Sequence, residues 1–293
     1  MPTVSIALCT YNGASFLSHQ LDSLASQTLL PDEIIICDDA SSDNSLQIAN
    51  SFASKVSIPV QIHQNKKNLG YVKNFENAIS RCTQDLIFLC DQDDLWHPEK
   101  IAQVVATFNA EPDVGLVLHD FCWIDDNNKP YQGPVDTYGP HHLRAAQLPQ
   151  EIKENSISVF MQPYPRAWCG CMMAYRRHFN PVVLPIFPGK GHDDWILKLL
   201  GPITETRFIA SPLVSYRMHE KNTNRRDLDK RTLQYFWQRF TKKITLVING
   251  HSKKNFYKSI ILALAKSKFE IRHPKILEYY KKYYKKQDSK SQI

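Results

Sequence analysis

Short apolar runs alternate with longer amphipathic stretches through the first half of the chain. Apolar runs of strand length occupy Val4–Cys9, Glu33–Cys37, Val60–His63, Leu86–Cys90 and Val114–His119. Between these runs, apolar residues recur at helical spacing, as in Ser15–Gln27 and Glu99–Asn109. Strands that alternate with helices are typical of βαβ units. The pattern therefore predicts an α/β fold with a Rossmann-like, mostly parallel sheet flanked by helices.

Polar residues directly follow three of these runs. The first run leads into Thr10-Tyr11-Asn12-Gly13, the second into Asp38–Asp43, and the fourth into Asp91–Asp94. Right-handed crossovers bring the carboxyl ends of parallel strands to one edge of the sheet, where such folds bind ligands. We therefore expect the three clusters to form one site. The glycine patterns GxGxxG and GxxxxGK[ST] are absent from the sequence, which disfavours a nicotinamide enzyme or an ATPase.

The third cluster is strongly acidic. Asp91, Asp93 and Asp94 come within four residues of a strand that is expected to be buried on both faces. Carboxylates crowded in this way repel one another, and a bound divalent cation removes that cost. Carboxylate oxygens suit Mg²⁺ or Mn²⁺. The alternative is an acidic turn that caps a helix beginning near Pro98, and the residues by themselves leave both interpretations open.

Later segments contribute further candidates. Residues 65–76 predict a turn that enters a helix. A helix N-terminus and the nearby Lys73 both favour the binding of a phosphate group. Residues 130–157 lose periodicity and predict a long functional loop or lid. Residues 168–175 predict a strand, and residues 191–200 predict a loop that opens a helix, where an aspartate is commonly the N-cap.

Composition bears on the cellular setting. No apolar run approaches the roughly 18 to 20 residues that span a bilayer. The N-terminus lacks the basic, apolar and cleavage regions of an export signal. The seven cysteines are odd in number, and Cys169-Gly-Cys171 lacks the second ligand pair expected of a zinc site. We therefore expect a reduced, cytoplasmic protein.

The net charge of +7 is unevenly distributed. From Arg225 onward there are 19 basic and 5 acidic residues, a net charge of +14, whereas residues 1–224 carry −7. This asymmetry predicts a globular domain at 1–224 and a basic helical extension at 225–293. Basic helices with interleaved aromatic residues suit an anionic membrane surface, and a solvated bundle packed through its aromatics is the alternative. No nucleic-acid-binding motif accompanies the charge, so we expect no nucleic-acid partner.

Several motifs, taken in order, resemble family 2 glycosyltransferases. They are Thr10-Tyr11-Asn12, Asp38-Asp39-Ala-Ser-Ser-Asp43, Asn68-Leu-Gly70…Lys73-Asn74-Phe75, Asp91-Gln-Asp-Asp-Leu-Trp96, His192-Asp-Asp-Trp195 and Tyr216-Arg-Met-His219. The resemblance covers roughly residues 3–224 and is greatest to bacterial rhamnosyltransferase-type enzymes that build surface polysaccharides. It implies the GT-A fold, with a nucleotide-sugar half at about 1–120 and an acceptor half at about 121–224.

The resemblance also implies roles for individual residues. Those that match nucleotide-binding positions are Thr10, Tyr11, Asn12, Asp39, Lys73 and Asp91. Asp93 matches a metal ligand, and His219 matches a residue that closes over the diphosphate or the metal. Asp193 matches the catalytic base, but Asp194 stands where such enzymes often have an aromatic residue, so the base is ambiguous by one position. With Asp193 as the base, Asp194 is expected to cap a helix that begins near Trp195. Lys73 stands where related enzymes frequently carry arginine.

These matches imply an inverting, metal-dependent glycosyltransferase. It would use Mn²⁺ or Mg²⁺ and a nucleoside-diphosphate sugar, with rhamnose as a candidate sugar. The acceptor is expected to be a glycan or a lipid-linked molecule in bacterial surface polysaccharide synthesis. The protein would then work in the cytoplasm, peripheral on the inner face of the plasma membrane. A non-catalytic module that binds nucleotide sugars or glycans on the same fold is the alternative.

Overall fold

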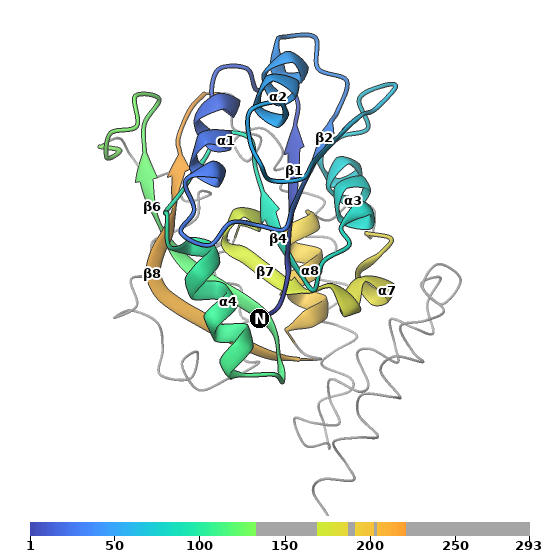
Figure 1. The fold of residues 1–293 in the computed structure, drawn as a ribbon, viewed down its shortest axis with the longest axis vertical. Coiled ribbons are helices and arrows are strands. Elements are labelled where there is room, and N and C mark those ends of the chain that lie inside the picture. The colour runs from blue at the N-terminus through green and yellow to red at the C-terminus, as the bar shows by residue number, and fades with distance from the viewer. Residues whose placement is uncertain (133–168, 187–190, 202–203, 221–293) are drawn as a thin grey trace, which may run out of the picture. The chain divides into compact units, whose positions relative to one another are not determined.

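The computed structural model describes residues 1–132, 169–186, 191–201 and 204–220 (Figure 1). By its internal contacts the chain divides into Met1–Glu220 and Lys221–Ile293, and every described residue belongs to the first unit. Most of the expected loop at 130–157 and all of the basic extension at 225–293 lie outside the described residues. The boundary after residue 224 and the two halves of the catalytic domain therefore stay predictions.

The described residues build one eight-stranded sheet with the order β3-β2-β1-β4-β7-β6-β8-β5. Its strands are β1 (Val4–Thr10), β2 (Glu33–Asp38), β3 (Val60–Gln64), β4 (Leu86–Cys90), β5 (Leu95–Trp96), β6 (Val114–Ile124), β7 (Met173–Arg176) and β8 (Glu205–Arg217). The pairs β1–β2, β1–β4, β2–β3 and β6–β8 are parallel. β7 runs antiparallel between β4 and β6, and β5 runs antiparallel to β8. The predicted, mostly parallel sheet is confirmed.

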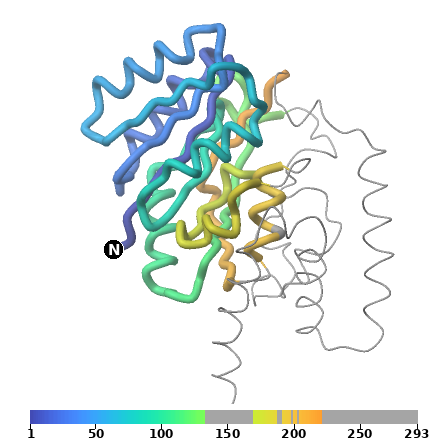
Figure 2. The backbone as a smooth tube through the Cα atoms, turned by 90° about the vertical axis from the view of Figure 1, so that its right-hand side faces the viewer, coloured from blue at the N-terminus to red at the C-terminus, as the bar shows by residue number. Residues whose placement is uncertain are grey.

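Helices cover both faces of this sheet. They are α1 (Leu17–Ala25), α2 (Ser45–Ala53), α3 (Tyr71–Arg81), α4 (Lys100–Ala110), α7 (Asn180–Val183) and α8 (His192–Leu200), with 3₁₀ turns η1 (Gly170–Met172) and η2 (Arg177–Phe179). Apolar residues of α1, α2 and α4 join one buried cluster with Ile6, Ile34 and Phe88 of the sheet. Figure 2 shows α4 in green and α8 in amber on opposite sides of the sheet. Because both faces are covered, every residue of β1, β2 and β4 is buried.

The apolar pattern located most of these elements closely. Four of the five predicted strands end within one residue of the observed ones, and β6 continues five residues beyond the predicted His119. The predicted helices at 15–27 and 99–109 match α1 and α4 within two residues at each end. Among the described residues, no helix has the length and apolar character of a membrane span.

The predicted strand at residues 168–175 is wrong in its first part. Gly170–Met172 forms the turn η1, and β7 begins only at Met173. At Gly170 the backbone passes so close to His192 that a Cβ atom would lie 2.5 Å from its Nε2. The carbonyl of Cys171 accepts a hydrogen bond from Lys100 Nζ at 2.6 Å. This carbonyl is therefore paired with a side chain and not with the backbone of a neighbouring strand.

Two expectations about helix starts are also wrong. α8 begins at His192 rather than near Trp195, with Gly191 at its N-cap and no side-chain capping bond, so Asp194 does not cap it. The acidic turn at 91–94 does not cap the next helix either, because β5 intervenes and α4 begins only at Lys100. The capping interpretation of the acidic turn is therefore excluded.

Candidate active site

The acidic turn Asp91–Asp94 follows β4 at the edge of the sheet and is held by Arg217. This arginine ends β8 and is completely buried. Its Nε donates to the carbonyl of Asp93 at 2.7 Å, and its backbone N–H donates to Oδ1 of Asp94 at 3.1 Å. Its Nη1 donates to the carbonyl of Asp125 at 2.7 Å. One guanidinium thus joins the acidic turn to the loop after β6.

The two predicted metal ligands lie side by side. His219 Nε2 is 2.9 Å from Oδ2 of Asp93, although 126 positions separate them in the chain. The His219 ring also packs against Phe16, with ring centroids 4.9 Å apart. Both side chains of the pair are mostly buried. A carboxylate oxygen beside an imidazole nitrogen supplies two ligands of the kind that divalent cations accept.

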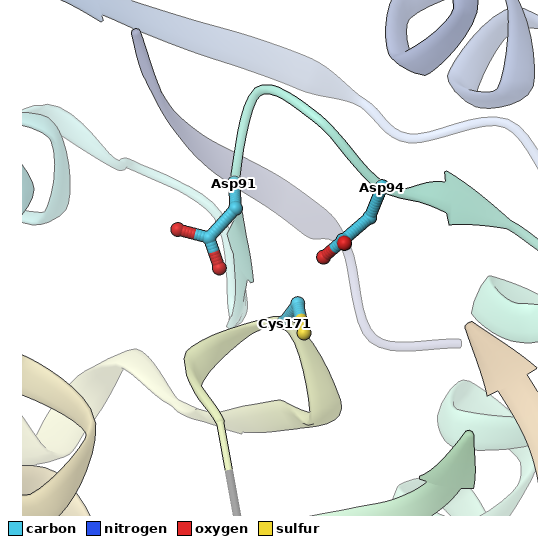
Figure 3. A group of neighbouring side chains, drawn as sticks. All are labelled: Asp91, Asp94 and Cys171. Carbon is cyan, nitrogen blue, oxygen red and sulfur yellow. The ribbon is translucent and has the colours of Figure 1, made fainter. Parts of the chain in front are cut away.

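Figure 3 shows Asp91 and Asp94 on the acidic turn, next to Cys171 of η1. One ligand atom from each of the three side chains lies within 4.8 Å of the other two. Burial raises the pKa of Asp91 well above its usual range, and the charges of Asp94 and Asp93 add to this effect. Burial and the charge of Asp93 raise the pKa of Asp94 to about 7. Positive charge is therefore strongly favoured in this space.

A fully buried lysine lies beneath the acidic turn. Lys100 donates from Nζ to the carbonyl of Cys171, and its Nζ lies 3.4 Å from the centroid of the Trp96 ring. Burial lowers the pKa of Lys100 to about 8, although the charges of neighbours such as Asp94 and Asp91 act to raise it. Sequence reasoning missed both Lys100 and Arg217, because charged side chains are seldom fully buried.

Thr10 and Tyr11 meet the acidic turn through Gln92. Thr10 Oγ1 and the backbone N–H of Tyr11 both donate to Gln92 Oε1, each at 2.8 Å. The Tyr11 side chain is largely exposed, which leaves its ring open to a stacking partner. Gln92 was not predicted to have a role, and its place between Asp91 and Asp93 is the only sequence signal for it.

Asn12 and Asp39 support the neighbouring loops. Asn12 adopts a positive φ of 49°, and its Oδ1 accepts a hydrogen bond from the backbone N–H of Ser42 at 2.9 Å. The carboxylate of Asp39 accepts from the backbone N–H groups of Leu69 and Gly70, at 2.8 and 2.9 Å. Asp39 therefore fixes the turn that enters α3 at the end of β2. The structure thus places Thr10, Asn12 and Asp39 at the same sheet edge.

Lys73 lies in the first turn of α3. Its ammonium pairs with Glu76 on the same helix, and 55% of its side chain is exposed. The carboxylate of Glu76 also accepts a hydrogen bond from the backbone N–H of Ile186 at 2.8 Å. In this conformation Lys73 forms an ion pair with Glu76. A contact between Lys73 and a diphosphate stays a prediction.

Asp193 lies in the first turn of α8 and is half-buried. Its Oδ1 accepts from the backbone N–H of Asp194 at 2.7 Å. The pKa of Asp91 is raised mainly by burial and by the charges of Asp94 and Asp93. The charge of Asp193 makes a smaller contribution in the same direction. His192 stacks on Phe75 with ring centroids 3.7 Å apart, which anchors the start of α8 to α3.

Known proteins share this sequence pattern. Residues 5–178 match the family described as Glycosyl transferase family 2. An uncharacterized glycosyltransferase of Nostoc sp. is 29% identical over 228 residues, covering 75% of this chain and 66% of that protein. The putative glycosyltransferase EpsE of Bacillus subtilis is 35% identical over 105 residues, covering 36% of this chain and 38% of that protein. The chain thus spans less than two thirds of the length of either relative.

Solved structures share the fold. A mannosyltransferase from Pyrobaculum calidifontis in complex with GDP-Man and Mn²⁺ superimposes with a TM-score of 0.58 at 16% identity, over 98% of this chain and 75% of that one. S. aureus TarS in complex with UDP-GlcNAc gives 0.56 at 18% identity, over 77% and 61%. These likenesses and the family match confirm the expected GT-A fold. With more than half of its length matched to the family, the chain is a member of glycosyl transferase family 2.

Proposed function

We propose that this glycosyltransferase moves a sugar from a nucleoside-diphosphate donor to a hydroxyl of a glycan or lipid-linked acceptor, with inversion at the anomeric carbon. The observation that carries the proposal is the convergence of predicted site residues from separate elements. Thr10 ends β1 and Asp39 follows β2 at one sheet edge, and at the acidic turn after β4 Asp93 meets His219. Asp193, in the first turn of α8, is close enough for its charge to contribute to the raised pKa of Asp91, which supports its place in this site.

A divalent cation fits the pair formed by Asp93 and His219. These residues would hold it through one oxygen and one nitrogen ligand. When bound, a cation of this kind acts as a Lewis acid on the departing diphosphate. Lys73, at the start of α3, would add a second positive charge for the phosphates once it leaves Glu76. The Mn²⁺ and GDP-Man in the P. calidifontis mannosyltransferase support this proposal.

The nucleotide would lie along the ends of β1, β2 and β4. The exposed ring of Tyr11 would stack on the base, and Asp39 and Asp91 would accept hydrogen bonds from the ribose. Thr10 and Asn12 would shape the loop beneath it, because both already form hydrogen bonds to neighbouring loops. UDP-GlcNAc bound to TarS supports a nucleotide-sugar donor.

Asp193 is the proposed general base. It would take the proton from the acceptor hydroxyl as that oxygen attacks the anomeric carbon from the face opposite the diphosphate. A single displacement of this type inverts the anomeric centre, whereas retention through a covalent intermediate requires a second nucleophile against the donor. The resemblance to inverting enzymes, rather than a distance in the structure, supports inversion.

The acceptor and the setting follow from the resemblance and from charge. Rhamnose is the first donor sugar to test, with surface polysaccharide synthesis as the process. The basic segment after residue 224 would bring the enzyme to the inner face of the plasma membrane, where lipid-linked acceptors lie.

A donor screen tests the proposal. Purified full-length protein would be heated with Mn²⁺ and each of a panel of nucleotide sugars, including dTDP-rhamnose, UDP-GlcNAc and GDP-Man. A ligand at 100 times its Kd should stabilise the native state by about 2.7 kcal/mol. The stabilising donor would then be used in transfer assays with a bacterial lipid extract, in which release of the nucleoside diphosphate is measured.

The Asp93→Ala variant separates the outcomes. It should lose both turnover and the Mn²⁺ dependence of donor binding, because the cation loses its carboxylate ligand. Asp113→Ala, a change at an exposed acidic residue of the loop before β6, should leave both unchanged. Full activity in Asp93→Ala, or in the wild type after exhaustive chelation, would contradict the metal-dependent mechanism. Donor binding without turnover would favour the binding-module alternative.

A further inference from the structure

Three aromatic rings form a stack that runs from the core to the surface beside the proposed base. Phe75 of α3 is 1% exposed, His192 at the start of α8 is 4% exposed, and Tyr71 at the start of α3 is 45% exposed. The ring centroids of Phe75 and His192 are 3.7 Å apart, and those of His192 and Tyr71 are 6.0 Å apart in an edge-to-face arrangement. Aromatic pairs prefer such arrangements, so the two inner rings hold the ring of Tyr71 in place.

The backbone that leads into Tyr71 is fixed as well. The carboxylate of Asp39 accepts hydrogen bonds from the backbone N–H groups of Leu69 and Gly70, and Gly70 has a positive φ of 83° that suits glycine. α3 then begins at Tyr71 itself. Because both its backbone and its ring are held before any ligand arrives, Tyr71 would lose little conformational entropy on contact with one.

The hydroxyl of Tyr71 lies near Asp193. Gly191 is the N-cap of α8, and a carbon atom added to it would collide with Oδ1 of Asp193. The same added carbon would lie 3.9 Å from the hydroxyl oxygen of Tyr71. The carboxylate and the hydroxyl therefore flank one point beside the backbone of Gly191. Tyr71 is thus within reach of a molecule that contacts Asp193.

The exposure of Tyr71 sets it apart in the described part of the chain. Among the exposed large apolar side chains there, only Tyr11 and Tyr71 are aromatic. Tyr11 follows β1 beside Gln92 of the acidic turn and is the proposed partner of the nucleotide base. Tyr71 lies on α3 beside the proposed general base, which acts on the acceptor. Aromatic side chains with a few polar groups nearby are typical of ligand sites.

We propose that Tyr71 is a stacking platform for a sugar ring of the acceptor, and that the acceptor is therefore a glycan that presents a pyranose to this ring. The inference rests on the proposed function, because it takes Asp193 as the base. The C–H groups on one face of a pyranose pack against an aromatic ring, while a hydroxyl at its rim reaches the carboxylate. A phosphate group offers no such face and favours cationic and N–H groups instead.

Sugar binding tests the platform without donor or turnover. Full-length protein, free of metal and nucleotide, would be mixed with methyl pyranosides of rhamnose, glucose and N-acetylglucosamine. Saturation transfer from aromatic protons of the protein to each pyranoside would be measured by NMR. At least one pyranoside should bind. Tyr71→Ala should weaken its binding roughly 5- to 150-fold, the range for bases stacked on aromatic side chains.

Two variants serve as controls. Tyr71→Phe should keep pyranoside binding, because the ring remains. Leu30→Ala should also keep it, since Leu30 is a similarly exposed apolar residue, at 44%, that precedes β2 at the opposite edge of the sheet. Circular dichroism and melting temperature would check that each variant folds. If Tyr71→Ala does not fold, Tyr71→Leu replaces it with the same expected loss, because leucine keeps an apolar contact but has no flat ring.

Competition with the donor panel assigns the bound sugar to the acceptor. Nucleotide sugars with Mn²⁺ should leave pyranoside binding in place, and displacement would put the pyranoside in the donor site and overturn the proposal. In transfer assays, Tyr71→Ala should raise the acceptor KM and keep the donor Kd within roughly twofold.

Two further results would overturn the platform: a wild-type protein that binds no pyranoside, and equal binding by Tyr71→Ala. Donor binding and turnover alongside either result would leave the proposed function standing. Pyranoside binding that depends on Tyr71, in a protein that binds no nucleotide sugar, would support the platform and contradict the proposed function.

Discussion

At the scale of single residues, the candidate base is determined by the direction of two adjacent side chains. Asp193 and Asp194 both lie in the first turn of α8, where successive side chains diverge by about 100°. The charge of Asp193 contributes to the raised pKa of Asp91, and its Oδ1 accepts a hydrogen bond from the backbone N–H of Asp194. Since α8 begins at His192, the expected capping role of Asp194 is replaced by a favourable interaction with the helix dipole.

Paired substitutions should separate the two aspartates. Asp193→Asn is expected to keep donor and Mn²⁺ binding but to lower kcat at least roughly 100-fold, the usual scale for a general base. Asp194→Asn removes one negative charge at the helix start and should cost about 0.3 to 1 kcal/mol of stability with little change in kcat. Measurements of kcat, donor Kd and melting temperature on both variants are sufficient. If only Asp194→Asn loses turnover, the base is Asp194. If neither variant loses turnover, the base is another residue.

Residue-level prediction from sequence succeeded where polar residues follow strands. Asp39 and Asp93 were placed at one edge by strand topology alone, and both lie there. It failed for Lys100 and Arg217, because the cost of burying a charge makes the surface the default expectation. Their burial depends on carbonyl acceptors at Cys171, Asp93 and Asp125, which no local pattern reveals.

At the scale of elements, the sheet divides into a part that local pattern predicts and a part that it does not. β1 to β4 are continuous apolar runs or short alternating ones, joined by helices in sequence order. β7 is only four residues long and inserts antiparallel between β4 and β6 through long-range pairing. β8 spans 13 residues, most of them only partly buried, so its sequence lacks a long apolar run. Such strands are defined by their partners rather than by their own periodicity.

The end of β8 is predicted to organise the acidic turn. Arg217→Met would leave the carbonyl of Asp93 without this donor, at roughly 1 to 3 kcal/mol, whereas the carbonyl of Asp125 would keep the hydrogen bond from the backbone N–H of Asn128. The free energy of unfolding should therefore fall by about 1 to 3 kcal/mol, as measured by urea denaturation. Donor affinity in Mn²⁺ should also fall more than affinity without metal, because Asp93 and His219 lose their fixed spacing.

Arg207 provides the matched control on the same strand. It pairs with Glu111 at the surface, so Arg207→Met should cost about 1 kcal/mol or less. It should not alter the Mn²⁺ dependence of donor binding. Equal loss of that dependence in both variants would show that Arg217 acts only through general stability.

At the scale of the whole molecule, charge is distributed unevenly along the sequence. The described unit belongs to the acidic part, and the acidic turn Asp91–Asp94 lies in it. The segment from residue 225 carries a net charge of +14 and lies outside the described residues. Each basic residue near an anionic leaflet contributes about 1 kcal/mol, and salt screens this attraction over about 8 to 10 Å. Sequence alone therefore predicts a salt-dependent membrane contact.

Vesicle binding tests that contact. Full-length protein should bind vesicles that contain anionic lipid, with affinity falling as salt rises, and should bind neutral vesicles much more weakly. A chain truncated after Arg272 loses six lysines and should bind less tightly. Replacement of the same six lysines by glutamine in the full-length chain should reproduce the loss if charge is the cause. Full binding by the glutamine variant, or binding that ignores salt, would instead favour a tail that packs its aromatic residues into a bundle.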